Sequence, residues 1–206
     1  PQTTAYRQIG GAPGPCYHHR EGAEIRRRFI EEAAKRYAGH PALLCWDLWN
    51  EPELTCGIWR EASQENMVCY CAHSVERFIL WLRRRYGSLE VLNRRWGRNY
   101  QAWEEIEPPR CAATFNDMVD WREFFGETLA EELHMRAKAV RLHDGEHSVM
   151  VHTVPMPYFN FMNTGSEEYL LAREMDWFGN SVGSMPFPAV TATTAARMPA
   201  ALRSVL

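Results

Sequence analysis

The chain has 206 residues, of which 46% are hydrophobic and 24% charged, and a formal net charge of −3. This length allows one sizeable domain, and the scattered basic residues are outnumbered by acidic ones, which argues against a nucleic-acid partner. No apolar run approaches the ~18 residues of a membrane span, so we expect no membrane partner. Six unevenly spaced cysteines predict free thiols or a metal site rather than a disulfide scaffold, which favours a reducing, cytoplasmic compartment.

The first regular elements form one helix–strand step. Apolar residues recur every four positions over residues 21–37, which predicts an amphipathic helix, and Gly39 follows its end. Residues 42–49 are a short apolar run rich in Leu and Trp, typical of a strand covered on both faces in a parallel sheet. The run breaks off at Asn50-Glu51-Pro52.

The middle of the chain reads as helical. An apolar stripe predicts a helix over residues 71–86, and Ser88 is expected to cap a short helix that contains Trp96. Residues 97–115 read as a loop. Asn116 is then expected to cap a helix of more than twenty residues, which closes at Asp144-Gly145.

The last third returns to alternating elements. We expect a strand over residues 148–154, a helix from a Ser166 cap to Arg173, a strand over residues 176–182 and a final helix from Ala189. No tight hairpin turn joins two strands, so parallel pairing through crossover helices is expected. Three strands are too few for a closed eight-stranded barrel of about 250 residues. The chain is therefore either a small open α/β sheet or the middle of a barrel, and long loops at the strand ends favour the barrel.

Asn50 and Glu51 are the first candidates for chemistry. α/β folds place their active sites at the carboxyl ends of parallel strands, where these two residues are predicted to lie. A carboxyl group buried beside an apolar strand has a raised pKa, which suits a general acid. The alternative is a purely structural role, in which Glu51 caps a following helix or pairs with an arginine. A bare Asn-Glu-Pro tripeptide is a weak motif without its strand context.

The surrounding blocks carry a family resemblance. Trp46-x-x-x-Asn50-Glu51-Pro52 resembles the fourth-strand signature of retaining glycosidases built on (β/α)₈ barrels. Further blocks resemble the family 42 β-galactosidases: Cys69-Tyr-Cys71, Phe78-x-x-Trp81-Leu82, Arg85-Tyr86-Gly87-Ser88-Leu89, Leu92-Asn93-x-x-Trp96-Gly97 and Trp103-x-x-Ile106. The resemblance covers nearly the whole chain. It implies a partial (β/α)₈ barrel, roughly strands four to six with their helices, with residues 1–206 as one incomplete catalytic domain.

The resemblance also implies roles for individual residues. Asn50 would contact the sugar and Glu51 would be the acid/base, while the nucleophile would belong to a seventh strand outside the chain. A β-galactoside or oligosaccharide is then the substrate, the chemistry needs no cofactor, and the parent protein is expected to form a homo-oligomer, a trimer. Further residues at or near strand ends are candidates to line the sugar pocket: Trp49, His152, Tyr158, Asn160 and Trp177. His152 has an equally good interpretation as a hydrogen-bonded core histidine.

The cysteines are a candidate metal site. Members of the family often hold a structural zinc with four cysteines, and Cys16, Cys69 and Cys71 match three of the positions. Ser74 stands at the fourth, which leaves tetrahedral zinc one ligand short. His18, His19 or His73 could supply the missing ligand. The alternative is a remnant site of free thiols.

Three other functions stay open at this stage. The parent could be another barrel glycosidase that acts on plant or algal polysaccharide. It could be a carbohydrate-binding relative that has lost activity, or the chain could be a complete small α/β domain without sugar chemistry. A strand ending in Glu within the next fifty or so residues of the gene would favour an enzyme.

Overall fold

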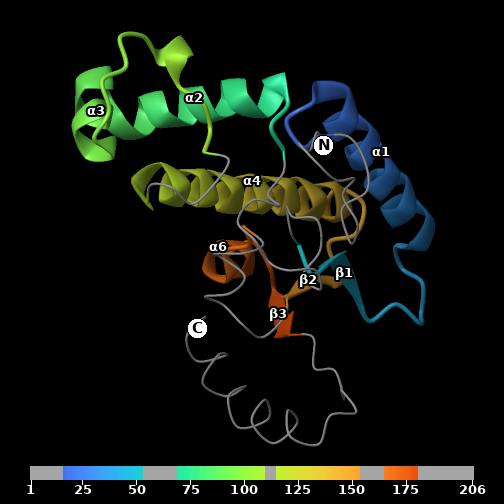
Figure 1. Cartoon of the computed structure of the whole chain (residues 1–206). Coiled ribbons are helices and arrows are strands. Elements are labelled where there is room, and N and C mark those ends of the chain that lie inside the picture. The colour runs from blue at the N-terminus through green and yellow to red at the C-terminus, as the bar shows by residue number, and fades with distance from the viewer. Residues whose placement is uncertain (1–15, 53–68, 110–114, 154–164, 181–206) are drawn as a thin grey trace, which may run out of the picture.

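The computed structural model describes residues 16–52, 69–109, 115–153 and 165–180. In this part of the chain a three-stranded sheet lies against one layer of helices, and further helices pack beyond that layer (Figure 1). Helices α1 (Arg20–Tyr37), α4 (Phe115–Arg141) and α6 (Glu168–Ala172) are next to the sheet. Helices α2 (Ala72–Tyr86) and α3 (Leu89–Trp96) pack on the far side of α4.

The sheet is parallel, as predicted. Its strands are β1 (Cys45–Asn50), β2 (Ser148–Thr153) and β3 (Trp177–Asn180), and they lie in chain order. β1 begins three residues later than the predicted strand, and β3 is shorter than its prediction at both ends. The pairing of β1 with β2 is irregular between Asp47 and Asn50. This irregularity changes which face of the sheet the last residues of β1 occupy.

The short helix α3 has the predicted cap, whereas the caps of α4 and α6 differ. Ser88 accepts a hydrogen bond from the Val91 amide at 3.3 Å. Asn116 lies inside α4, and its side-chain amide donates to the Arg95 carbonyl instead of capping the helix. Glu167 caps α6 by accepting from the backbone amides of its first turn, so the predicted cap Ser166 is one residue too early.

The predicted loop after α3 and the predicted final helix are the remaining elements to compare with the structure. The predicted loop over residues 97–115 contains a short 3₁₀ turn, η2 (Trp103–Glu105). The final helix predicted from Ala189 lies outside the described residues. None of the described helices, including the 27-residue α4, is long and apolar enough to cross a membrane.

The core between α2, α3 and α4 is built from aromatic rings. Phe78 is fully buried, and its ring centroid lies 4.7 Å from that of Trp121 in an edge-to-face arrangement. Trp121 makes a second edge-to-face contact with Phe125 at 4.5 Å. Such pairs add about 0.5–1.5 kcal/mol to the burial of their area. Much of the aromatic content therefore stabilises the helical layers rather than forming a platform for sugars.

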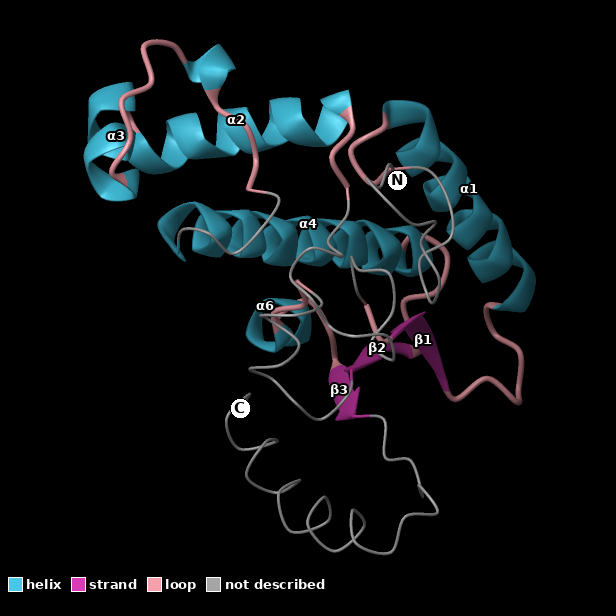
Figure 2. Ribbon diagram, in the orientation of Figure 1, coloured by secondary structure: helices cyan, strands magenta, loops and turns pink. Residues whose placement is uncertain are grey.

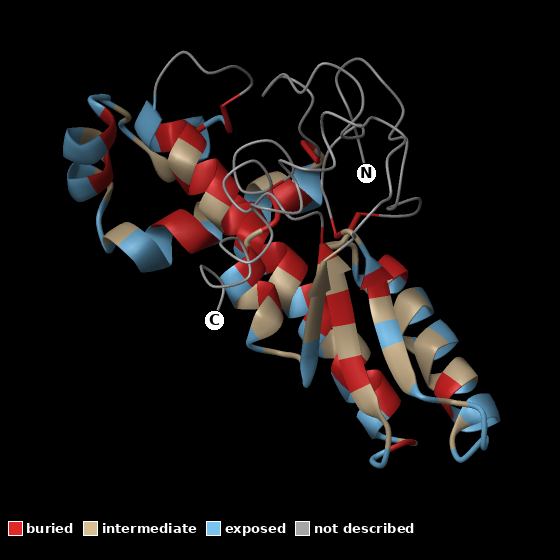
Figure 3. Ribbon diagram, turned by 90° about the horizontal axis from the view of Figure 1, so that it is seen from below, coloured by how far each residue is buried: buried red, intermediate tan, exposed pale blue. Residues whose placement is uncertain are grey.

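The two faces of the sheet differ sharply. Val149 and Val151 point toward the helices and are fully buried, with Trp46 and Leu48 packed beside them. Figure 2 shows the helices gathered on this one side of the strands. No described element covers the opposite face, which Figure 3 views from the sheet side. We call it the uncovered face; it carries Cys45, Asp47, Asn50, Met150, His152, Trp177 and Gly179.

Candidate active site and thiol cluster

Glu51 occupies a sharp turn directly after β1. Its φ angle is 47°, which makes it the only described residue other than glycine with a positive φ. For a residue with a side chain this left-handed conformation costs about 1–2 kcal/mol, and such strain is concentrated at functional sites. The Glu51 amide still donates to the His152 carbonyl at 3.0 Å. The turn is therefore held against β2, and it ends the strand where the sequence predicted.

His152 bridges two polar residues of β1. Its Nε2 lies 2.9 Å from Asn50 Oδ1, and its Nδ1 lies 2.7 Å from Asp47 Oδ2. The three side chains project from the uncovered face, so His152 is not part of the helix-covered core. The structure thus brings together Asn50 and His152, two of the predicted sugar-binding residues. Asp47 was missed by sequence reasoning, although a polar residue between Trp46 and Leu48 marks the side of the strand that the helices do not cover.

The other predicted pocket residues fall in different places. Trp49 is buried in the helical core, 5.5 Å between ring centroids from Tyr17, so packing fits its position better than sugar contact. Trp177 is 47% exposed on the uncovered face. It begins β3, however, and therefore lies at the opposite end of the sheet from Glu51. Tyr158 and Asn160 lie outside the described residues.

A buried ion-pair network fixes the carboxyl end of β1. Glu132 of α4 accepts from Arg26 of α1 at 2.9 Å and from Arg136 at 3.0 Å. Arg136 also donates to the Leu48 carbonyl at 3.0 Å and lies 3.8 Å from the centroid of the Trp49 ring. The Leu48 carbonyl lies within the irregular part of the β1–β2 pairing, where Arg136 provides it with a hydrogen-bond donor. Two helices are therefore tied to the strand that carries Asn50 and Glu51.

The acidic residues around α6 and β3 have structural partners. Glu167 caps α6, and Glu168 accepts a hydrogen bond from Thr153. Glu174 pairs with His134, and Asp176 accepts a hydrogen bond from the Val149 amide. None of these four residues therefore stands out as a second catalytic carboxylate, and the location of the nucleophile on another strand stays a prediction.

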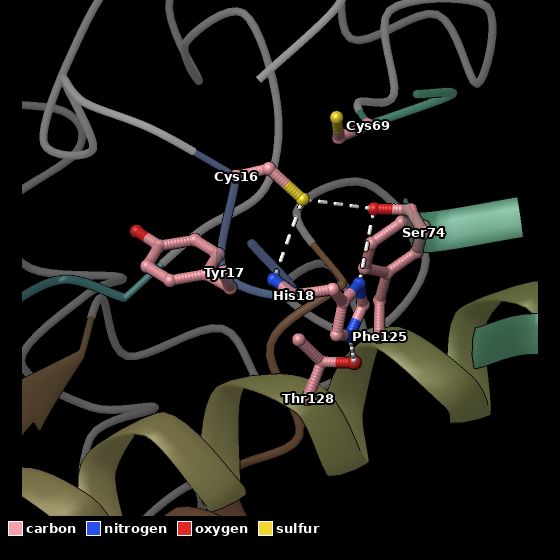
Figure 4. Close-up of a pocket in the computed structure, with 7 residues that line it drawn as sticks. All are labelled: Cys16, Tyr17, His18, Cys69, Ser74, Phe125 and Thr128. Carbon is pink, nitrogen blue, oxygen red and sulfur yellow. Dashed lines mark hydrogen bonds between the residues drawn. The ribbon is translucent and has the colours of Figure 1, made fainter. Parts of the chain in front are cut away.

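A second cluster joins the segments that precede α1 and α2. The sulfur atoms of Cys16, Cys69 and Cys71 all lie within 4.8 Å of one another, and those of Cys16 and Cys71 are 3.4 Å apart. Ser74 Oγ lies 3.2 Å from Cys16 Sγ and 3.7 Å from Cys71 Sγ. Figure 4 shows Cys16, Ser74 and the His18 ring converging. We call Cys16, Cys69 and Cys71 the thiol cluster.

The thiol cluster fits three positions of a zinc site. Sulfur ligands of tetrahedral zinc stand about 3.8 Å apart when each zinc–sulfur bond is about 2.3 Å. The hydrogen bond with Cys69, followed by burial, raises the pKa of the Cys16 thiol, so a metal would have to displace its proton. Burial, reinforced by the charges of Arg77 and Arg26, lowers the pKa of His18 to about 4.

Comparisons with known proteins agree with the fold. The family model for the β-galactosidases of glycoside hydrolase family 42 matches residues 2–195. The chain belongs to this family.

The matches to individual relatives extend over more than half of this chain but over only a small part of each relative's length. A β-galactosidase from Geobacillus sp. (strain Y412MC61) is 32% identical over 122 residues, which are 55% of this chain and 17% of that protein. A β-galactosidase structure from Bacillus circulans sp. alkalophilus matches with a TM-score of 0.70 at 22% identity, over 93% of this chain and 28% of that one. A family 42 exo-carrageenase from Bacteroides ovatus matches with a TM-score of 0.65 at 20% identity, over 80% and 23%. The chain thus spans under a third of each relative.

Family 42 membership explains the uncovered face. The β-galactosidase structures similar to this chain are (β/α)₈ barrels, so its strands and helices form part of such a barrel, as predicted. Helices surround the outside of these barrels, and the active site lies at the carboxyl ends of the strands. The uncovered face is therefore the side that belongs to the barrel interior. That residues 1–206 form one domain stays a prediction.

Proposed function

We propose that the protein containing this chain is a retaining β-galactosidase in which Glu51 is the general acid/base. The observation that carries the proposal is the position of Asn50 and Glu51 at the carboxyl end of a barrel strand, with Asn50 on its interior side. The strained backbone of Glu51 supports it, because the sequence keeps a glutamate where glycine would be favoured.

The chemistry needs two carboxyl groups. In a retaining mechanism one protonates the leaving oxygen, and a second, about 5 Å away, attacks the anomeric carbon; the first then activates water to release the sugar. We assign the first role to Glu51 and expect the second residue on a strand outside this chain. No cofactor is needed for either step.

Asn50 and His152 are assigned to sugar binding. Because the His152 ring contacts Asn50 and Asp47 at once, it can hold the Asn50 amide in one orientation toward a sugar hydroxyl. Tyr158 and Asn160 follow β2 in the sequence and keep the same proposed role. Trp177 is a weaker candidate because it lies at the other end of its strand, and Trp49 is weaker still because it is buried.

The test is turnover of a nitrophenyl β-galactoside by the intact protein. Glu51→Gln should lower kcat/KM by about 10²–10⁴-fold, the usual contribution of a general acid or base. The loss should be larger for alkyl galactosides than for nitrophenyl ones, because a good leaving group needs less protonation. Glu90→Gln, an exposed change on α3, is the matched control. Unchanged turnover in Glu51→Gln would refute the role of Glu51.

A polysaccharide substrate is the second candidate. The observation that favours it is the similarity to the exo-carrageenase of the same family. A panel of galactosides and sulfated galactans, tested with the intact protein, separates the two. Binding of galactosides without turnover of any substrate would instead support a carbohydrate-binding relative.

Two finer expectations accompany the proposal. None of the four described cysteines forms a disulfide, which supports a reducing, cytoplasmic location. The family resemblance implies a homotrimer, and light scattering of the intact protein measures its oligomeric state.

A further inference from the structure

The thiol cluster lacks one good ligand. Three of its donors are thiols, and the fourth group that reaches it is the Ser74 hydroxyl. Zinc in proteins is held by thiolates, imidazoles and carboxylates, and a structural site has four of them. A neutral hydroxyl is a poor replacement, so the question is which other side chain can enter the fourth position.

The hydrogen bonds around His18 fix its tautomer. Thr128 Oγ1 donates to the Phe124 carbonyl at 2.8 Å, so toward His18 Nε2, at 3.1 Å, its oxygen acts as an acceptor. Nε2 therefore carries the ring proton, and Nδ1 carries the lone pair. Nδ1 lies 3.0 Å from Ser74 Oγ, on the side of the ring that faces the cluster (Figure 4).

This is the arrangement that metal-binding histidines require. Such a histidine almost always donates its other ring N–H to a neighbouring acceptor, which fixes the ring and directs the free nitrogen at the metal. Stacking on Phe124, with ring centroids 5.2 Å apart, adds a second constraint on the His18 ring. The His18 amide also donates to Cys16 Sγ at 3.3 Å, which holds this sulfur close to the His18 backbone.

The other two histidines of this region are less suitable. His19 accepts a hydrogen bond from the Gly22 amide through Nδ1 as the N-cap of α1, so that nitrogen is occupied. His73 is exposed, and its ring contacts that of His19 at 4.8 Å between centroids.

We propose that His18, through Nδ1, completes a zinc site with the thiolates of Cys16, Cys69 and Cys71. Ser74 then turns from bridging Nδ1 and Cys16 to donating a hydrogen bond to a thiolate. The metal joins the segment before α1 to the segment before α2 and, through Thr128, to α4. This site is separate from the proposed glycosidase chemistry, so either proposal can fail without the other.

X-ray absorption on the intact, zinc-loaded protein tests the ligand set directly. We expect three sulfur ligands at about 2.3 Å and one nitrogen at about 2.0 Å. Cobalt substitution should give the intense visible bands of a tetrahedral site. A shell of three sulfurs with oxygen only, or no stoichiometric zinc at all, would overturn the proposal.

Three variants separate His18 from Ser74. Competition with a chromophoric chelator should show zinc affinity weakened by about tenfold or more in His18→Ala, with the nitrogen signal lost. Ser74→Ala is the matched control and should keep both the affinity and the nitrogen ligand. Ser74→Cys should bind zinc more tightly, through four sulfurs. Loss of the nitrogen in Ser74→Ala, or its persistence in His18→Ala, would contradict the assignment.

Discussion

The two faces of the sheet are built for different tasks. The helix-covered face is apolar and complete, with Val149 and Val151 fully buried. On the uncovered face the Asp47 side chain is 42% exposed and that of His152 19%. Because side chains alternate along a strand, one short sheet can place its stabilising residues on one side and its polar chemistry on the other. Described residues thus pack the helix-covered side, whereas the proposed active site needs further strands.

Removing Phe78 should have the largest effect on stability, because the covered side depends on its aromatic packing. Phe78 is fully buried on α2 against Trp121 and Phe124. Phe78→Ala should lower the free energy of unfolding of the intact protein by about 3–5 kcal/mol. Urea denaturation measures the change.

Leu80 of the same helix provides the matched control. It is 45% exposed, so Leu80→Ala should change stability by about 0.5 kcal/mol or less. Equal losses in the two variants would mean that the aromatic layer does not carry the stability of this region.

Glu132 links the covered side to the proposed active site. Its side chain is 4% exposed and neutralises Arg26 and Arg136, of which the second holds the Leu48 carbonyl. Glu132→Ala should cost about 3 kcal/mol, because it leaves two mostly buried cations without their partner. It should also lower kcat, since the carboxyl end of β1 loses its support.

Glu131→Ala is the control for Glu132. Glu131 is its neighbour in the sequence, but it is 60% exposed and pairs with Arg77 at the surface. The control should lose at most about 0.5 kcal/mol and keep full activity. If Glu132→Ala destabilised the protein without affecting turnover, the network would be structural only.

Trp49 shows why some of the site could not be predicted from the sequence. Strand alternation predicts that it shares a face with Asp47, on the side of the sugar. The irregular pairing between Asp47 and Asn50 breaks that period, so Trp49 joins the core while Asn50 turns to the uncovered face. The position of Glu51 was predictable because an apolar run ends there. The irregular pairing of β1 leaves no such signal in the sequence, because Arg136, which donates to the Leu48 carbonyl, lies 88 residues away.

The thiol cluster was also only partly predictable from the sequence. Cys16, Cys69 and Cys71 could be identified through the family resemblance, and the structure brings their sulfurs together. The choice of His18 among three nearby histidines depends on Thr128, which lies 110 residues later. Similarly, Ser166 was predicted to cap α6, but the observed cap is Glu167. Ser166 is buried, whereas the Glu167 carboxylate accepts hydrogen bonds from two backbone amides.

Replacing Glu51 separates backbone strain from catalysis. Because its φ is 47°, Glu51→Gly should be more stable than Glu51→Ala by about 1 kcal/mol, although glycine normally destabilises a folded chain. Both variants should lose turnover of galactosides to a similar extent as Glu51→Gln. Thermal unfolding of the two proteins measures the difference. Equal stability would show that the turn relaxes and that the strain is absent in solution.

Asp144 gives the smallest expected effect, on the covered side. Burial opposes its charge, but hydrogen bonds from the Trp46 indole and from His147 outweigh it and hold the pKa of Asp144 at about 2. Because this pKa lies below its ordinary value near 4, the folded state binds fewer protons than the unfolded state. The stabilisation is therefore present above about pH 4 and is lost as the pH falls toward 2.

Asp144→Asn removes this titration while keeping the shape of the side chain. At neutral pH the variant should be less stable by about 1 kcal/mol, the net value of one typical intramolecular hydrogen bond. The difference from wild type should shrink as urea unfolding is repeated from pH 6 to pH 3. Glu146→Gln, an exposed neighbour, should show a constant difference near zero. A gap that stays constant for Asp144→Asn would mean that the hydrogen bonds act through geometry and that the charge contributes nothing to this end of the sheet.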